Sequence, residues 1–468
     1  MSNNTVKTRF APSPTGQLHL GNVRTALFSA LHARHAGGRF LLRIEDTDKA
    51  RSREAFTRWI EDDLRWLGLT WDEGLDAGGD AGPYVQSARE PIYADLYARL
   101  QAAGRAYPCF CTQEQLEASR AAQRAAGRPP RYAGTCARLS AEEAAARVLA
   151  GEPHTLRFRV PAGETIEFED LVRGPQCFSS DDIGDFVIRR TDGTPAFFFC
   201  NAVDDALMGV THVWRGEDHL SNTSRQLLIL RALGLPEPRY GHLALIVGED
   251  GAPLSKRHGA MSLEELRERG YLPAAVTNYL ARLGHTYASD ALLNLDALAA
   301  AFDPVRLGRS AARFDLAQLD HWQKRALAAA TPAQLVKWAG GSLTAVPVAQ
   351  RERFMATVRD NVLFPADVLV WAQSVYEKIV PDEPAEAAIK DAPRELFTTA
   401  LELLSAHGDD FRAWTKAISV RTGLKGRALF MPLRAALTGR AHGPEMAHFF
   451  ALLGREKIEQ RLRAVMEE

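Results

Sequence analysis

The chain of 468 residues lacks several features that mark particular classes of protein. It has no uninterrupted apolar run long enough to span a bilayer. Its first residues, 1–9, lack the apolar stretch of a secretory signal peptide. Only five cysteines are present, and this odd number favours a reducing compartment over a disulfide framework. We therefore expect a cytoplasmic protein with no membrane segment.

The chain also lacks an excess of charge of either sign, since its formal net charge is -1. Any affinity for RNA must then come from local basic patches, because neutralisation of phosphates drives such binding. The candidate patches are Arg120, Arg124, Arg128 and Arg131 and, later in the chain, Lys416, Arg421, Lys425, Arg427 and Arg434. Each of these residues taken alone is equally compatible with a solvated helix face.

The first hundred residues have the pattern of a nucleotide-binding unit. Residues 6–11 predict a strand that leads into a Pro/Gly turn, and Asn22 is predicted to cap the following helix. The pair Gly37 and Gly38 ends that helix, and residues 40–44 form an apolar run typical of a parallel strand. Strand, helix and strand in this order predict a βαβ unit.

Ligands of such sheets bind at the carboxyl ends of the strands, where the turn around His19 and the acidic residues 45–48 both fall. A glycine turn lets backbone approach a nucleotide, and the helix N-terminus behind it presents free N–H groups to phosphates. A histidine can donate to a phosphate oxygen, and a lysine can neutralise charge that develops during transfer. His19 and Gly21 fit the first role, and Lys256 fits the second. A lone His-x-Gly is more often a structural turn.

Two distant segments give these residues their significance. Residues 9–22, RFAPSPTGQLHLGN, and residues 253–259, PLSKRHG, resemble the HIGH and KMSKS signatures of class I aminoacyl-tRNA synthetases. With RIEDTD at 43–48, the first segment resembles the form found in bacterial glutamyl-tRNA synthetases. The resemblance extends along the chain through the segments 203–205, 209–219, 314–316 and 422–439.

The resemblance implies an α/β fold with a Rossmann-type catalytic domain, an inserted acceptor-binding domain and an all-α anticodon-binding region. The implied parts are the first half of the catalytic domain (1–104), the connective insertion (105–195), the second half of the catalytic domain (196–250), the KMSKS-like loop with a helical region that contacts the tRNA stem (251–320) and the anticodon-binding region (321–468). Helical periodicity in segments such as 396–404 and 458–465 independently predicts a helical final third. We expect residues 381–393 to be a polar link between two helical halves.

The implied activity is that of a glutamate–tRNA ligase, in which ATP activates glutamate to glutamyl-adenylate before transfer to the terminal adenosine of tRNA. The cofactors would be ATP and Mg²⁺, and the partners L-glutamate and tRNA-Glu, tRNA-Gln or both, with the protein acting as a monomer. By motif position, His19, Gly21, Lys256 and Arg257 would be catalytic, and His19, Gly21, Asn22 and Lys256 would bind ATP. The glutamate pocket would consist of Arg9, Ser13, Glu45, Asn201 and Arg215, with either arginine able to hold the side-chain carboxylate.

Two positions depart from the family pattern. The family usually has a tyrosine at Phe197, so one hydrogen bond of the pocket, worth on the order of 1 kcal/mol, is missing. Many members have a lysine at Pro253, which leaves Lys256 as the single lysine of the motif. These departures point weakly to a duplicated form of the enzyme, and the choice of tRNA stays open.

Some members of the family bind zinc in the insertion through a Cys-x-Cys pair, a later cysteine and a tyrosine or histidine. Here Cys109, Cys111 and Cys136 match, and Arg138 replaces the histidine, which leaves Tyr132 as the fourth candidate ligand. Three free cysteines are the alternative. Cys177 and Cys200 are predicted to be small core residues.

Three other functions compete with this one. A shortened relative glutamylates a modified tRNA base, and a nucleotidyltransferase of the same fold acts on small molecules, but neither needs the long helical third. A catalytically inactive tRNA-binding paralogue would be expected to lack His19, Glu45 or Lys256, and all three are present.

Overall fold

The computed structural model describes residues 5–48, 51–255, 258–259, 261–377, 379–408 and 410–467, which form two compact units. Unit 1 comprises Met1–Glu265 and Val276–Leu316, and unit 2 comprises Leu266–Ala275 and Ala317–Glu468. Within the described part of the chain, no helix is long and apolar enough to cross a membrane. The domain boundaries expected at 104, 195, 250 and 320 stay predictions.

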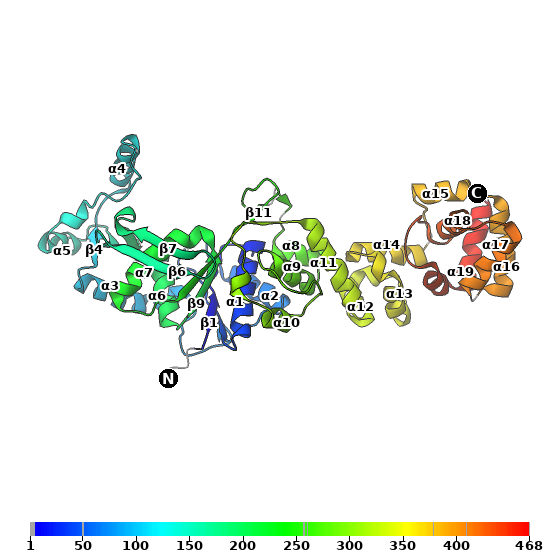
Figure 1. Cartoon of the computed structure of the whole chain (residues 1–468), viewed down its shortest axis with the longest axis horizontal. Coiled ribbons are helices and arrows are strands. Elements are labelled where there is room, and N and C mark those ends of the chain that lie inside the picture. Colours follow the sequence, from blue (N-terminus) through cyan, green and yellow to red (C-terminus); the bar gives the residue numbers. More distant parts are fainter. Residues whose placement is uncertain are drawn as a thin grey trace. The chain divides into compact units, whose positions relative to one another are not determined.

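A seven-stranded sheet forms the centre of unit 1 (Figure 1), in the order β3-β2-β1-β9-β10-β6-β7. Neighbouring strands are parallel, except that β6 and β7 form an antiparallel pair. The strands are β1 (Lys7–Phe10), β2 (Arg39–Leu42), β3 (Glu73–Gly74), β6 (Thr165–Asp170), β7 (Gly174–Ser179), β9 (His212–Gly216) and β10 (Arg239–Leu243). The mostly parallel sheet confirms the predicted α/β class.

Helices cover both faces of this sheet because alternate strand residues point to opposite sides. On β1, the Thr8 hydroxyl donates to Ser29 O of α1, whereas the next residue, Arg9, pairs with Asp205 of α6. A cluster of buried apolar residues joins sheet residues such as Leu41 and Val213 to α3, α6 and α7. Helices outside the insertion include α1 (Leu20–His35), α2 (Glu54–Trp66), α3 (Glu90–Ala102), α6 (Phe197–Leu207) and α7 (Leu220–Leu233), with α10 (Leu295–Ala300) packed on α1, while α9 (Pro273–Arg282) begins in unit 2 and ends in unit 1.

The predicted βαβ unit is confirmed, with one correction. Strands β1 and β2 are parallel and in register, and α1 ends before Gly37, whose φ of +59° suits a residue without a side chain. The prediction that Asn22 caps α1 is wrong. The helix begins at Leu20, so His19 occupies the N-cap position with extended backbone, and Asn22 lies in the first turn.

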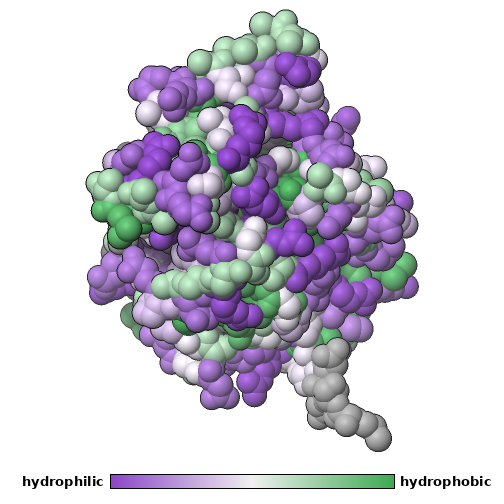
Figure 2. Space-filling view, turned by 90° about the vertical axis from the view of Figure 1, so that its left-hand side faces the viewer, coloured by the Kyte–Doolittle hydropathy of each residue, from purple (hydrophilic) through white to green (hydrophobic). Residues whose placement is uncertain are grey.

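The segment predicted as an insertion forms a small three-stranded antiparallel sheet of β4 (Ala106–Cys109), β5 (Thr155–Phe158) and β8 (Phe186–Arg189). It also carries α4 (Gln113–Ala125) and α5 (Ala141–Leu149), neither of which has a buried residue. The face of unit 1 that bears these helices is largely hydrophilic (Figure 2). The same segment supplies β6 and β7, which extend the main sheet.

Unit 2 is helical throughout its described residues, as predicted. Its helices are α11 (Leu316–Ala329), α12 (Pro332–Ala339), α13 (Arg351–Val358), α14 (Pro365–Tyr376), α15 (Glu383–Lys390), α16 (Arg394–His407), α17 (Phe411–Thr422), α18 (Arg427–Thr438) and α19 (Met446–Glu467). The short α8 (Leu263–Arg269) crosses from unit 1 into unit 2. Residues such as Phe354, Trp414 and Phe449 are fully buried in the core of unit 2.

The predicted polar link at 381–393 needs a correction, because it contains the helix α15. The Asp382 side chain caps this helix by accepting from Ala385 N, and Pro384 lies in the first turn, where its missing N–H costs nothing. Proline and acidic residues that suggested a link are therefore the start signals of a short helix.

Candidate active site

A cavity of about 400 Å³ opens at the carboxyl ends of β1, β2 and β9. The residues predicted to bind glutamate and ATP meet there, although they come from four separate stretches of sequence. Its lining includes Arg9, Ser13, His19, Gly21, Asn22, Glu45, Asn201 and Arg215, together with Phe197. Lys256 and Arg257 lie outside the described residues. Unit 1 thus assembles eight predicted residues around one space.

Glu45 is held in this cavity by a buried ionic network. Its Oε1 accepts from Arg43 Nη2 over 2.9 Å and from Asn201 Nδ2 over 2.7 Å. Arg43 is fully buried and also donates to Asp205 Oδ1 over 2.7 Å. Burial raises the pKa of Glu45 from its ordinary value, although Arg43 opposes this shift. The network fixes the carboxylate at one wall of the cavity.

The two candidate arginines differ in what already holds them. Arg9 is paired with Asp205, 3.2 Å from Nε to Oδ1, and its Nη1 donates to Trp214 O. Arg215 makes no ion pair with any described carboxylate, and its buried Nη1 has no hydrogen-bond partner among the described residues. Burial lowers the pKa of Arg215 to about 10, so it remains a cation near neutral pH. Arg215 therefore presents an unused donor and an unneutralised charge.

The His19 turn leaves space beside the N-terminus of α1. A side chain at Gly21 would meet only the His19 ring, at an ordinary contact distance of 3.6 Å. The fold itself does not require glycine at this position, since its φ is not in the left-handed region. What the missing side chain provides is room in the cavity, next to backbone N–H groups of the first helical turn.

The three predicted cysteines of the insertion also come together. Ligand atoms of Cys109, Cys111 and Cys136 all lie within 4.8 Å of one another. The Tyr132 hydroxyl lies 3.3 Å from Cys109 Sγ and 3.6 Å from Cys111 Sγ. Burial opposes ionisation of Cys109, but hydrogen bonds from Tyr132, the Cys111 backbone and Arg157 together lower its pKa to about 7.

The other two cysteines behave differently from each other. Cys200 is buried as predicted, whereas the prediction of a core position for Cys177 is wrong, because Cys177 is exposed. It lies on β7 at the outer edge of the sheet, where alternate residues face solvent.

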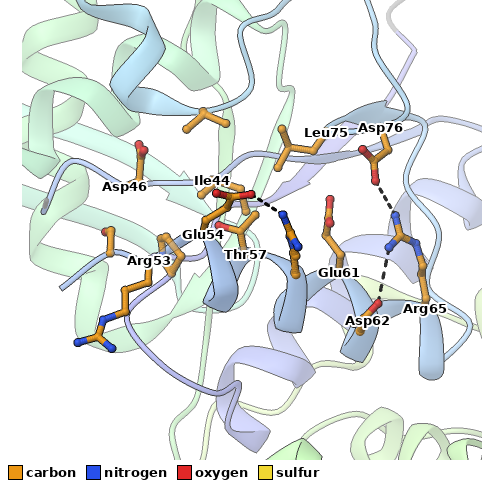
Figure 3. Close-up of a pocket in the computed structure, with 14 residues that line it drawn as sticks. Ile44, Asp46, Arg53, Glu54, Thr57, Glu61, Asp62, Arg65, Leu75 and Asp76 are labelled. Atoms are coloured by element: carbon orange, nitrogen blue, oxygen red, sulfur yellow. Dashed lines mark hydrogen bonds and ion pairs between the residues drawn. The ribbon is translucent and has the colours of Figure 1, made fainter.

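A second hollow, of about 690 Å³, lies beside the same wall (Figure 3). Pro14 and Asp46 line it, whereas their neighbours Ser13 and Glu45 line the first cavity. Ion pairs occupy much of its lining, with Arg58 2.6 Å from Glu54 and Arg65 3.0 Å from Asp76. Glu61 is 8% exposed, and its Oε1 has no hydrogen-bond partner within the described part of the chain.

Sequence reasoning missed Arg43, Asp205, Asp170 and His242, which support the cavity from behind. One signal for them was available. Asp204 and Asp205 stand in the mostly apolar segment Phe197–Leu207, and buried acids require cationic or hydrogen-bonding partners. Asp170 and His242 had no comparable signal, because each lies at the end of a short strand.

Comparisons with known proteins agree along the whole chain. A family model described as "tRNA synthetases class I (E and Q), catalytic domain" matches residues 5–321, and an "Anticodon binding domain" model matches residues 333–466. Glutamate–tRNA ligase 2 of Alkalilimnicola ehrlichii is 58% identical, with 100% of this chain and 99% of the relative covered. Glutamate–tRNA ligase 1 of Halorhodospira halophila is 54% identical, with coverages of 99% and 97%. The crystal structure of a glutamate tRNA ligase from Elizabethkingia meningosepticum in complex with its amino acid has a TM-score of 0.90 at 29% identity and covers 99% of both chains.

Proposed function

Because the chain belongs to the class I tRNA synthetases for glutamate and glutamine, we propose that the cavity of unit 1 is its active site. The chain is an aminoacyl-tRNA ligase that activates glutamate and charges tRNA with it. The observation that carries the site assignment is that Arg215, whose buried Nη1 has no hydrogen-bond partner among the described residues, lines the same cavity as Glu45. This pair of opposite charges is complementary to an amino acid that carries both a side-chain carboxylate and an ammonium group.

Of the two arginines, Arg215 is proposed to hold the side-chain carboxylate of glutamate. The charge of Arg9 is already matched by Asp205 at 3.2 Å, whereas Arg215 has no such partner among the described residues. A buried guanidinium without a counter-charge is costly until an anion binds to it. Glu45, held by Arg43 and Asn201, is proposed to accept from the substrate ammonium. Ser13 would add a hydroxyl at the cavity edge.

ATP is proposed to lie beside the His19 turn. Gly21 and Asn22 line the cavity at the N-terminus of α1, where N–H groups and the helix dipole favour phosphate. His19 would donate to a phosphate oxygen, and Lys256 with Arg257 would neutralise charge on the departing pyrophosphate. A glutamate carboxylate oxygen then attacks the α-phosphate, and the bond to pyrophosphate breaks as glutamyl-adenylate forms. A hydroxyl of the terminal adenosine of tRNA next takes the glutamyl group and releases AMP.

Magnesium would enter as a complex with ATP. Within the described residues, the single group of three close metal-ligand side chains is the cysteine cluster, whose thiols suit softer metals. When bound, the ion would neutralise phosphate charge.

Zinc is proposed to bind the cysteine cluster in a structural role. Two thiolates on one tetrahedral zinc, each with a Zn–S bond of about 2.3 Å, lie about 3.8 Å apart. The Cys111 and Cys136 sulfurs are 3.6 Å apart, so the observed spacing fits. Tyr132 is the fourth proposed ligand, since its hydroxyl already accepts from Cys136 N at 2.8 Å and so presents oxygen toward the thiols. Zinc would cross-link the two ends of the segment 109–136.

The test of the proposed function is ATP–pyrophosphate exchange with glutamate, in the presence and absence of tRNA-Glu or tRNA-Gln. Exchange with glutamate but not with aspartate or glutamine supports the assignment. Absence of exchange under every combination, with tRNA binding intact, would instead identify an inactive tRNA-binding paralogue.

The same assay addresses the finer parts of the proposal. We propose tRNA-Glu as the principal substrate, and charging of tRNA-Gln alone would indicate a duplicated, specialised form. We also propose that the enzyme works as a monomer in the cytoplasm. Sedimentation of the chain at assay concentrations tests whether it is a monomer, because a dimer would sediment as a species of twice the mass.

A further inference from the structure

We infer that Asp170 and His242 are positioning residues that fix the Arg215 guanidinium for glutamate binding. The inference rests on the proposed role of Arg215 and extends it to two residues that do not line the cavity. The three side chains form a buried hydrogen-bonded line across β6, β10 and β9, and Arg215 at its end lines the cavity.

The topology of the sheet brings these residues together. His242 on β10 is paired in register with Arg215 on β9, and Asp170 ends β6, the next strand along. Asp170 itself is fixed firmly, because its Oδ1 accepts from the backbone N–H groups of Val172 and Arg173 at 2.9 and 2.8 Å. The side chains of Asp170 and His242 are both completely buried.

The contacts determine which nitrogen of His242 carries the proton. Asp170 Oδ2 lies 2.5 Å from His242 Nδ1. Burial alone would raise the pKa of Asp170, but the hydrogen bond with His242 outweighs this effect and the pKa is lowered. An ionised carboxylate only accepts hydrogen bonds, so Nδ1 must donate. Nε2 then has a free lone pair, and it accepts from Arg215 Nε at 3.0 Å. Asp170 therefore selects the one tautomer of His242 that can hold the arginine.

This arrangement uses one edge of the guanidinium and leaves the rest for the substrate. Arg215 Nε donates to His242, and Nη2 donates to the Thr223 hydroxyl over 2.6 Å. Nη1, which is buried and lacks a partner among the described residues, is the remaining donor. The Tyr240 ring, 5.0 Å from the guanidinium carbon, supports the plane from the side. The guanidinium is thus oriented without being neutralised.

Protonation of His242 would remove the acceptor and set a second cation against Arg215. The titratable and charged groups around His242 within the described residues include Asp170, Arg215, Arg173 and His219, and the Tyr240 ring stacks on its ring with centroids 6.2 Å apart. Burial lowers the pKa of His242, and the Asp170 hydrogen bond opposes that shift. The imidazole is therefore neutral above its ordinary value of 6.5, and glutamate binding should weaken only as the pH falls below that value.

The test compares two substitutions at the same position. His242→Gln places an amide oxygen near the position of Nε2 and keeps an acceptor for Arg215, whereas His242→Asn is too short to do so. We expect His242→Asn and Asp170→Asn to raise the KM for glutamate about tenfold or more, with the KM for ATP changed less than about twofold. The glutamate KM of His242→Gln should stay within about threefold of that of the parent. Because glutamine does not titrate, this KM should also no longer rise at acidic pH.

Several outcomes would overturn the inference. Equal KM values for His242→Asn and His242→Gln would show that the acceptor is irrelevant, and parallel losses in both substrates would show a merely structural role. If the asparagine variants do not fold, the decision passes to His242→Gln, for which a glutamate KM more than about threefold above that of the parent contradicts the inference. A parent protein that shows no glutamate-dependent exchange would instead reject the proposed function.

Discussion

Arg43 donates from Nη2 to Glu45 Oε1 over 2.9 Å, and neither side chain is exposed by more than 5%. Arg43 also contacts Asp205 at 2.7 Å, so one buried cation serves a carboxylate of the cavity wall and a carboxylate behind it. Because Asp205 also holds Arg9, the position of Glu45 and the position of Arg9 depend on the same pair of charges.

Replacing Arg43 by methionine should therefore destabilise unit 1. The change leaves Glu45 and Asp205 buried without a shared counter-charge, and breaking buried pairs in this way costs about 3–5 kcal/mol. Chemical denaturation monitored by tryptophan fluorescence measures the change. The matched control is Arg58→Met, which breaks an exposed pair with Glu54 and should change stability by less than about 0.5 kcal/mol. Similar losses for the two variants would contradict the assigned importance of the network.

Arg215→Met should raise the KM for glutamate far more than the KM for ATP. The substitution removes the donor proposed to bind the side-chain carboxylate, and losing a charged hydrogen bond is worth about 1.5–3 kcal/mol, roughly 10- to 150-fold. Steady-state aminoacylation at varied glutamate measures the effect. Arg225→Met, on the same helix as Thr223 but outside the cavity lining, is the control. A normal glutamate KM for Arg215→Met would return the role to Arg9.

Gly21→Ala should leave the fold intact but weaken ATP binding. A methyl group at this position contacts only the His19 ring at 3.6 Å, so the melting temperature should change little. In the cavity the same methyl group would occupy space proposed for the nucleotide, and we expect the KM for ATP to rise about tenfold or more, since a misplaced group near reacting atoms is costly. An unchanged KM for ATP would place the nucleotide away from the His19 turn.

Glu61→Gln should stabilise the protein at pH 7 by on the order of 1 kcal/mol, because it removes a charge whose Oε1 is buried without a partner. Burial, followed by the nearby Asp76 carboxylate, raises the pKa of Glu61. The native state then binds more protons than the unfolded state between 4.5 and the raised value, so stability falls as the pH rises through that window. The stability gain of the Glu61→Gln variant should therefore vanish below pH 4.5.

Denaturation curves of Glu61→Gln at pH 4 and pH 7 test this sign. Asp62→Asn removes a neighbouring carboxylate whose side chain is 65% exposed, and it should show no comparable gain at pH 7. If Glu61→Gln increases the free energy of unfolding equally at both pH values, the charge of Glu61 is not the cause of the increase.

Zinc content should depend on the three clustered cysteines and not on the exposed Cys177. Purified protein is expected to hold one zinc per chain, and Cys111→Ser should lose it because a hydroxyl is a poorer zinc ligand than a thiolate. Metal analysis after removal of loosely bound ions provides the readout. Cys177→Ser, which changes an exposed cysteine away from the cluster, should retain the metal. Zinc-free parent protein would favour three free thiols.

The parts of the fold that depend on local pattern were predictable from the sequence. The run at 40–44 and the glycines after α1 carry their own signals, so the βαβ unit followed from them. Helix starts were less predictable, because His19 takes the N-cap position through the path of its backbone and not through a side-chain hydrogen bond. The helix α15 was missed because proline and acidic residues mark helix starts as well as links.

The site was predictable where residues touch the cavity and not where they support it. Motifs selected Arg9, Glu45 and Arg215, and the structure brings these three residues to one cavity. The pairing of Arg43 with Asp205 joins positions 162 residues apart, and such contacts depend on which strands become neighbours. Hydrophobic periodicity does not specify strand order, so the supporting residues emerge only from the folded sheet.

The hairpin of β6 and β7 ties the inserted segment to the main sheet, since β6 lies beside β10. Excision of residues 105–195, or their exchange for the corresponding segment of another synthetase, would take the outer strands with it. A chimera would then have to rebuild the edge of the main sheet. An exchange of the insertion should therefore preserve the main sheet only with junctions that leave the hairpin in place.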